Sequence, residues 1–287
     1  GTYNLNTGST NSSECIAADS GYHVPTEGST GQVACPAGTY QNQTGQSACT
    51  EVEPGHYTDS LASMQQSECL AGTYQPQAGQ SSCVDAQPGH YVSEDGSNVQ
   101  HPCPSGYYNP SPAASSFDAC MPADPGYFTD SEGRASQGEC SLGTYQPNSG
   151  QSACLESDPG YFVASTASIS QSPCPAGTYN PSKSSVSGVD CMPADSGNYV
   201  DVQASPSQTP CSPGTYQPDL GQVSCPYTES GHYAPNEGQS EQTPAPLGTY
   251  ITDSGSTTFE HCPEGHVTIQ EGAVSVDDCF LDSDGDG

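Results

Sequence analysis

The residues of this 287-residue chain with the most distinctive chemistry are its 15 cysteines. Cysteine has two common structural uses, disulfide bonding and metal coordination. Zinc sites usually contain Cys-x-x-Cys pairs or clustered histidines, and the sequence has no Cys-x-x-Cys pair. The spacing therefore favours disulfides over zinc. Disulfides in turn predict an oxidising environment, such as the extracellular space, the cell surface or the periplasm.

The composition indicates that a large apolar core does not hold this chain together. Only 31% of its residues are hydrophobic, against about 45–50% in a typical globular domain. Glycine and proline occur 32 and 26 times, and tryptophan is absent. Cross-links that restrict the unfolded chain are the natural substitute for a missing core.

The charge excludes whole classes of partner. Two basic side chains stand against 33 acidic ones, which gives a formal net charge of -31. Nucleic acids require clustered lysine and arginine, so they are excluded as partners, and anionic membranes are disfavoured for the same reason. No apolar run is long enough to cross a bilayer, so we expect no transmembrane segment and place any export signal or anchor outside this sequence.

The sequence gives no support for catalysis. It has no set of nucleophile, base and orienting group outside its repeats, and no phosphate-binding loop of recognised form. We therefore expect a protein that is not an enzyme and that has no organic cofactor.

The cysteines follow an internal repeat. The stretch CPAGTYQNQTGQSAC from Cys35 recurs with small changes from Cys69, Cys140 and Cys211, and cysteine-free copies such as VEPGHY from Val52 lie halfway between. The unit is a module of 17 residues, extended to 20 in some copies, with glycine at position four, an aromatic residue at position six and a closing residue at position 15. Cysteine-bearing modules begin at Cys35, Cys69, Cys103, Cys140, Cys174, Cys211 and Cys262, and cysteine-free modules at Ala18, Val52, Ala86, Ala123, Ser157, Ala194, Thr228 and Ala245.

The closing residue alternates with the module type. In cysteine-free modules it is glutamine in seven cases, Gln32, Gln66, Gln100, Gln137, Gln171, Gln208 and Gln242, and Phe259 in the eighth. Cysteines are thus present or absent two at a time within a module. This predicts the pairs Cys35/Cys49, Cys69/Cys83, Cys103/Cys120, Cys140/Cys154, Cys174/Cys191, Cys211/Cys225 and Cys262/Cys279. Pairing across cysteine-free modules, as in Cys49/Cys69, is the alternative, but it leaves Cys225 without a partner.

Two further expectations follow from the alternation. The glutamine amide is suited to bind backbone groups where a disulfide would otherwise sit. Cys15 remains alone, because Gly1, Thr2 and Tyr3 read as part of a truncated cysteine-bearing module. It is expected to be unpaired within the chain or to bond intermolecularly.

Each module reads as two short extended segments joined by a turn. Pro-Gly in EPGHY, QPGHY and DPGYF suits a type II turn, with glycine at the position of positive φ. Modules this small must stack on their neighbours. We expect the aromatic residues at position six to supply most of the apolar contact and to form the core of this stack. The predicted fold class is all-β, an elongated rod of small disulfide-rich, hairpin-like modules with little helix. The predicted domains are a truncated module at 1–17, alternating modules at 18–244, atypical terminal modules at 245–279 and an acidic calcium-type motif or linker at 280–287.

The string C-x-x-G-T-Y followed by a closing cysteine resembles the cysteine-rich ephrin-receptor-like repeat of extracellular proteins. The resemblance extends over nearly the whole chain through Cys279 and implies an elongated stalk cross-linked by disulfides. That family commonly has cysteine pairs in successive modules, whereas here every second pair is replaced.

Two other residue sets have side chains of the kind that bind ions. His56, His90 and His232 share one module position, with His23 nearby, and we interpret them as surface residues too far apart to share an ion. A second set, expected to cap turns rather than to form a cation-binding stripe, comprises the carboxylates Asp19, Glu53, Asp124, Asp158, Asp195 and Glu229.

The C-terminal string D-x-D-G-D-G resembles the start of an EF-hand-like or thrombospondin type 3 calcium loop. It makes Asp282, Asp284 and Asp286 candidate calcium ligands, with a plain acidic tail as the alternative. Asn11 and Asn42 lie in glycosylation sequons.

Together these features predict an extracellular or cell-surface structural protein that forms the shaft of a surface filament, stalk or appendage. The alternative is the stalk of an adhesin or receptor ectodomain that presents a binding domain outside this chain, and residues 245–279 are the most anomalous segment. The expected partners are copies of itself or other surface proteins, and glycans are possible partners too.

Overall fold

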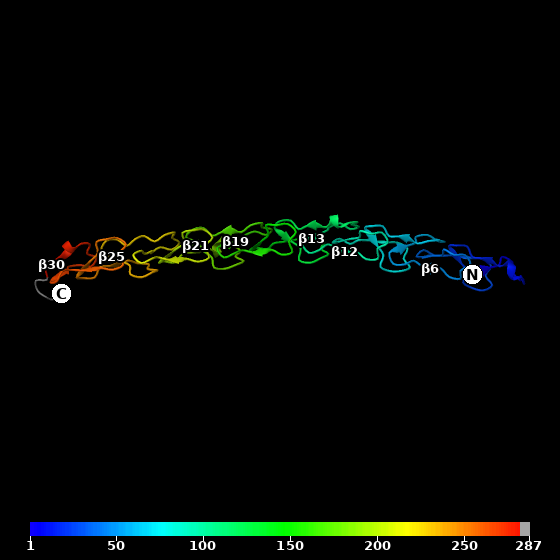
Figure 1. Cartoon of the computed structure of the whole chain (residues 1–287), viewed down its shortest axis with the longest axis horizontal. Helices are drawn as coiled ribbons and strands as arrows, with labels where there is room; N and C mark the ends of the chain where they lie inside the picture. The colour runs from blue at the N-terminus through cyan, green and yellow to red at the C-terminus, as the bar shows by residue number, and fades with distance from the viewer. Residues whose placement is uncertain (282–287) are drawn as a thin grey trace. The chain divides into compact units, whose positions relative to one another are not determined.

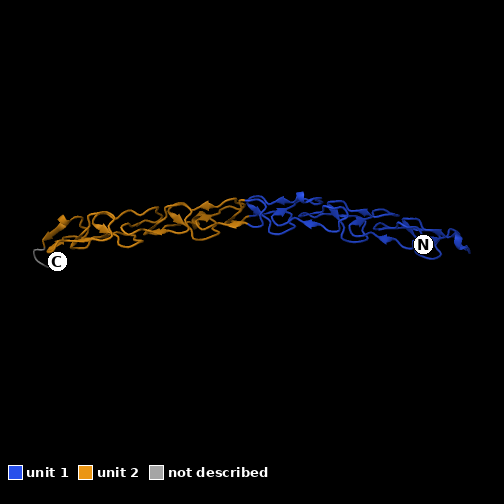
Figure 2. Cartoon of the chain, viewed as in Figure 1, with its two compact units in different colours: residues 1–139, 148–153 blue, residues 140–147, 154–287 orange. Residues whose placement is uncertain are grey.

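The structure, a computed structural model, describes residues 1–281 of the chain. These residues fall into two compact units, one made of residues 1–139 and 148–153 and the other of residues 140–147 and 154 onward (Figure 2). Within each unit the modules follow one another in sequence order, and nearly every module contributes one small antiparallel hairpin (Figure 1). The predicted class of small, disulfide-rich, almost entirely β repeats is confirmed.

In the first unit the hairpins pair strands of two residues each. They are β1 (Thr2–Tyr3) with β2 (Ile16–Ala17), β3 (Tyr22–His23) with β4 (Val33–Ala34), β5 (Thr39–Tyr40) with β6 (Thr50–Glu51), β7 (His56–Tyr57) with β8 (Ser67–Glu68), β9 (Thr73–Tyr74) with β10 (Val84–Asp85), β11 (His90–Tyr91) with β12 (His101–Pro102), β13 (Tyr107–Tyr108) with β14 (Met121–Pro122) and β15 (Tyr127–Phe128) with β16 (Gly138–Glu139).

The second unit continues the pattern. Its hairpins are β17 (Thr144–Tyr145) with β18 (Leu155–Glu156), β19 (Tyr161–Phe162) with β20 (Ser172–Pro173), β21 (Thr178–Tyr179) with β22 (Met192–Pro193), β23 (Asn198–Tyr199) with β24 (Thr209–Pro210), β25 (His232–Tyr233) with β26 (Thr243–Pro244), β27 (Thr249–Tyr250) with β28 (Glu260–His261) and β29 (His266–Thr268) with β30 (Cys279–Leu281). The module at Cys211 has a single bridge, between Thr215 and Tyr227.

Four 3-10 helices of one turn lie directly before a closing cysteine. They are η1 (Ser12–Glu14) before Cys15, η2 (Phe117–Ala119) before Cys120, η3 (Gly188–Asp190) before Cys191 and η4 (Val276–Asp278) before Cys279. The last three occupy modules whose cysteines are 17 rather than 14 residues apart. A serine or asparagine caps each helix by accepting from a backbone N–H of its first turn. The extra residues of the longer modules thus form a local helical turn, and the two cysteines still lie close enough to form a disulfide.

Within each unit, backbone hydrogen bonds connect a module to the next. Between the modules that begin at Val52 and Cys69, N–H groups donate from Gly55 to Gln75, from Cys69 to Gly55, from Thr58 to Gln80 and from Gly79 to Val52. The corresponding bonds recur in the second unit, where Gly197 donates to Gln217 and Cys211 donates to Gly197. Because one hairpin of two residue pairs is not stable alone, these bonds make each module depend on its neighbours.

The core is a narrow column of small residues rather than a stack of aromatic rings. Position one is completely buried in all modules from Ala18 to Ala245, with cysteine, alanine, valine, serine or threonine there, as at Cys35, Val52 and Ser157. Position seven is also buried. The expectation that the aromatic residues at position six form the core is wrong, since Tyr40 and Tyr57 are only half-buried. Side chains alternate between faces along an extended segment, so burial of position seven turns position six outward.

Position seven differs between the two module types. Cysteine-free modules have an apolar residue or threonine there, whereas cysteine-bearing modules have glutamine or asparagine, except the module at Cys262, which has Thr268. The buried Gln41 amide donates to the Ala48 carbonyl at 2.9 Å and accepts from the Gln43 N–H at 3.0 Å. In the modules at Cys103 and Cys174 asparagine takes this place. Asn180 accepts from the Ser182 N–H at 3.0 Å, but its Nδ2 donates to the Tyr161 carbonyl of the preceding module at 3.1 Å. Each of these amide oxygens thus binds the turn of its own module, and each amide nitrogen donates to a backbone carbonyl of its own or the preceding module, so the buried polar groups are satisfied.

Glycine at position four allows the closest approach between modules. Gly55 has φ 83°, and the His56 N–H donates to the Glu53 carbonyl at 3.1 Å, which closes the type II turn predicted from Pro54-Gly55. A Cβ placed on Gly55 would lie 2.0 Å from the carbonyl oxygen of Gly96, two modules further along. The absence of a side chain is therefore required by packing as well as by φ.

We predict that Gly55→Ala is much more destabilising than Gly28→Ala. Gly28 also has positive φ, at 77°, but no atom lies within 4 Å of a Cβ added there. Both variants incur about 1–2 kcal/mol for alanine at positive φ, and Gly55→Ala adds a further ~1–3 kcal/mol because the neighbouring backbone must move. Denaturant unfolding under non-reducing conditions measures the difference, and equal midpoints would contradict this account of the packing.

Candidate functional site: the module closures and the His23 cluster

In every module except the one at Ala245, the closing residue is linked to the first or second residue, and we call this link the module closure. In cysteine-bearing modules it is a disulfide: Cys35–Cys49, Cys69–Cys83, Cys103–Cys120, Cys140–Cys154, Cys174–Cys191, Cys211–Cys225 and Cys262–Cys279. Closing a loop of this length stabilises by roughly 3 kcal/mol in the chain-entropy model. The starting cysteine of all but the last pair is completely buried.

Cysteine-free modules are closed by a glutamine side chain instead. Gln171 Oε1 accepts from the Asp158 N–H at 2.7 Å, and its Nε2 donates to Asp158 Oδ2 at 2.8 Å. The bond to the backbone N–H of position two recurs in the other six modules, at Gln32, Gln66, Gln100, Gln137, Gln208 and Gln242. The expected bonding of the glutamine amide in place of a disulfide is thus present.

The carboxylates at position two belong to this closure. Asp19, Glu53, Asp124, Asp158, Asp195 and Glu229 each accept from the glutamine amide of their own module, at distances between 2.7 and 3.4 Å. The observation supports their role at the turn. Within residues 1–281 they form no group with the spacing of a metal site.

The module at Ala245 has an aromatic contact at its closing position. Phe259 packs edge-on against Tyr233 of the preceding module, with ring centroids 5.5 Å apart, and against His261 at 5.5 Å. In the same module the Tyr250 hydroxyl donates to Glu260 Oε2 at 2.7 Å. This carboxylate raises the pKa of Tyr250 above its ordinary value, because ionisation would lose the hydrogen bond.

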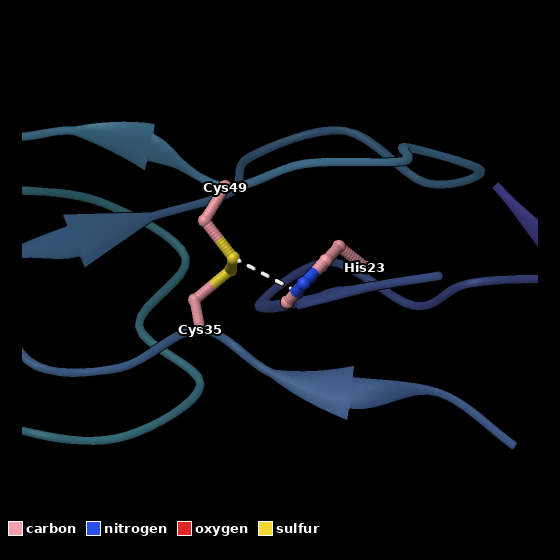
Figure 3. A group of neighbouring side chains, drawn as sticks. All are labelled: His23, Cys35 and Cys49. Atoms are coloured by element: carbon pink, nitrogen blue, oxygen red, sulfur yellow. Dashed lines mark hydrogen bonds between the residues drawn. A yellow bond between two sulfur atoms is a disulfide. The ribbon is translucent and has the colours of Figure 1, made fainter. Parts of the chain in front are cut away.

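One histidine lies against a disulfide. His23 Nδ1 is 3.1 Å from Cys49 Sγ, and Figure 3 shows the imidazole facing the bond between Cys35 and Cys49. The nitrogen and the two sulfurs all lie within 4.8 Å of one another, the only such group of three potential metal ligands in residues 1–281. Cys35 is buried, whereas His23 and Cys49 are half-buried. In the oxidised state the sulfurs are bonded to each other and are not thiolates.

Sequence reasoning interpreted His23 as a surface residue and missed this contact. The available signal was its place in the module: position six is tyrosine or phenylalanine in the other cysteine-free modules, from Tyr57 to Tyr250. The remaining histidines of the set do not gather in the part of the chain described. His56 Nε2 is 4.0 Å from Glu68, and the rings of His90 and His232 face backbone carbonyls two residues before them.

Residues 21–69 and 231–279 match the family model described as Tyrosine-protein kinase ephrin type A/B receptor-like. The chain carries ephrin-receptor-like repeats at these two positions. The resemblance drawn from the C-x-x-G-T-Y string is confirmed at these two positions, which lie near opposite ends of the sequence. No curated protein matches the chain.

The remaining predicted residues have varied surroundings. Cys15 is exposed and unpaired. Asn11 caps helix η1 by accepting from the Ser13 N–H at 3.0 Å, and Asn42 is exposed. The candidate calcium ligands Asp282, Asp284 and Asp286 lie outside the described residues. None of the helices in residues 1–281 has the length and apolar character needed to span a membrane.

We predict that a glutamine closure partly replaces a disulfide closure. Cys69→Ala with Cys83→Ala loses the cross-link, worth about 3 kcal/mol. Cys69→Ala with Cys83→Gln recovers about 1 kcal/mol of this, because the new amide binds the Leu70 N–H as Gln66 binds that of Glu53. Denaturant unfolding of both double variants against the parent chain measures the recovery. Identical midpoints for the two variants would show that the amide does not act as a closure.

Proposed function

We propose that the chain is a structural element of the extracellular space that forms the shaft of a surface filament, stalk or appendage. The observation that carries the proposal is the recurrence of the same backbone hydrogen bonds from module to module within each unit. An array of this kind extends by adding modules, and each addition buries the exposed backbone of the one before. The proposal assigns no catalytic role to any residue.

The location outside the cell has independent support. Seven disulfides and the ephrin-receptor-like repeats point to an extracellular or secreted protein. Attachment to a cell surface is part of the proposal. The large excess of acidic side chains keeps such a shaft soluble, and lateral association requires cations or salt that screen this charge.

The second candidate function is the stalk of an adhesin or receptor ectodomain. It is favoured by the departure of the Ala245 module from the common closure, where Phe259, Tyr233 and His261 form an aromatic cluster. In this case the shaft presents a binding domain located outside the chain, and the partners are other surface proteins or glycans.

Calcium and glycans are further parts of the proposal. Asp282, Asp284 and Asp286 have the carboxylate spacing of a calcium loop. Asn42 offers an exposed side chain for N-glycosylation, and the Asn11 amide nitrogen has no hydrogen bond among the described residues because only its oxygen is used in the helix cap.

Electron microscopy of the native full-length protein tests this function. We expect regular filaments in which subunits contact one another. Isolated rods that end in a globular head and never join would contradict the shaft and support the adhesin. The same preparation with a calcium chelator, beside a variant with the three aspartates changed to asparagine, tests the metal. Filaments that survive both treatments unchanged would exclude a structural role for calcium there.

A further inference from the structure

The His23 cluster contains a donor set that the shaft function does not use. The two sulfurs of the Cys35–Cys49 disulfide and His23 Nδ1 lie within 4.8 Å of one another, and the nitrogen is 3.1 Å from Cys49 Sγ. A tetrahedral zinc ion holds sulfur and nitrogen ligands about 3.5–3.8 Å apart. Opening the S–S bond would therefore leave these atoms close to the separations that a metal ion requires, with adjustments within the reach of side-chain rotation.

The backbone of the modules holds the three residues of the cluster near one another before any ion binds. Cys35 and Cys49 are the first and closing residues of their module, and the antiparallel pairs Thr39 with Glu51 and Tyr40 with Thr50 hold the two ends together beside the disulfide. His23 approaches from the preceding module, which is bonded to this one through the Cys35 N–H and the Gly21 carbonyl at 2.9 Å. Backbone bonds thus keep all three residues near one another without the covalent link.

The cluster is also specific to one module. Phenylalanine or tyrosine occupies the place of His23 in the other cysteine-free modules, including Tyr57 before the Cys69–Cys83 module. Neither residue is a good zinc ligand, whereas imidazole is the commonest one. The chain therefore contains a matched module with the same kind of disulfide and no imidazole at the position equivalent to His23.

From this geometry we infer that the Cys35–Cys49 module is a redox-dependent site for a soft divalent cation, with zinc as the representative ion. With the disulfide intact the sulfurs are unavailable. When a dithiol or phosphine reductant opens it, the two cysteines and His23 bind the ion, and water occupies the fourth position. The ion then replaces the covalent bond as the closure of this module.

The chemistry balances with the reductant included. A phosphine and one water molecule convert the disulfide to two thiols while the phosphine becomes its oxide, so two electrons pass to sulfur. Binding of Zn²⁺ displaces one proton from each thiol, and both thiolates and the lone pair of His23 Nδ1 coordinate the ion. The imidazole stays neutral, with its proton on Nε2.

Site-resolved alkylation of the full chain tests the inference. A limiting amount of phosphine opens about one disulfide per molecule, so most module closures stay intact. Zn²⁺ is then added at one equivalent, an alkylating reagent marks free thiols, and mass spectrometry after digestion reports each cysteine separately. We expect zinc to slow alkylation of Cys35 and Cys49 at least about tenfold, because ligated thiolates are poor nucleophiles. Cys69 and Cys83, where opened in the same sample, should show much weaker protection.

The His23→Tyr variant is the matched control. Tyrosine occupies the equivalent position at Tyr57, so the module should fold as its neighbour does. In this variant the protection of Cys35 and Cys49 should fall to the level of Cys69 and Cys83. Equal alkylation of Cys35 and Cys49 with and without zinc would overturn the inference. So would equal protection of the Cys69–Cys83 pair, a comparison that needs no variant.

Discussion

The close approach of backbone to backbone between successive modules is the constraint on which the rest of the structure depends. At Gly55 the N–H and the carbonyl oxygen both bond to the next module, and the missing side chain leaves room for the carbonyl of Gly96 two modules further on. Such an approach leaves no space between modules for large side chains. The buried column therefore holds cysteine, alanine, valine and uncharged polar residues, and the aromatic rings lie at its border.

A column this thin cannot be stabilised by apolar burial alone, so each module needs a closure of its own. Two chemically different closures meet this need: a disulfide at Cys35–Cys49, and in the module before it the amide of Gln32 bonded to the Asp19 backbone and carboxylate. Only the first responds to a reductant. Alternation thus places the disulfide modules from Cys35 to Cys211 beside modules whose hydrogen-bonded closures are insensitive to redox change, which limits the loss of structure when one disulfide opens.

Features of the fold could be predicted from the sequence where a residue type has only one structural consequence. Pro54-Gly55 specified a type II turn, and the exchange of cysteine for glutamine indicated the amide closure. Burial at position seven was not predictable, because strands of two residues are too short to show an alternating pattern. The left-handed conformation of Ala62 and Ala167 was hidden too, since other modules place glycine there and only the neighbouring contacts reveal the shared backbone shape.

The residue type at position six can change the chemistry of a module without changing its fold. Its side chain is half-buried and lies near the closing end of the next module, as His23 does at Cys49 and Tyr233 does at Phe259. Neither the ladder of backbone bonds nor the buried column depends on which ring stands there. A change of residue type at this position therefore alters the surroundings of a closure while the module keeps its fold. His23 is the position where the chain makes that change toward a metal ligand, and the disulfide beside it is the one whose chemistry should differ from the others.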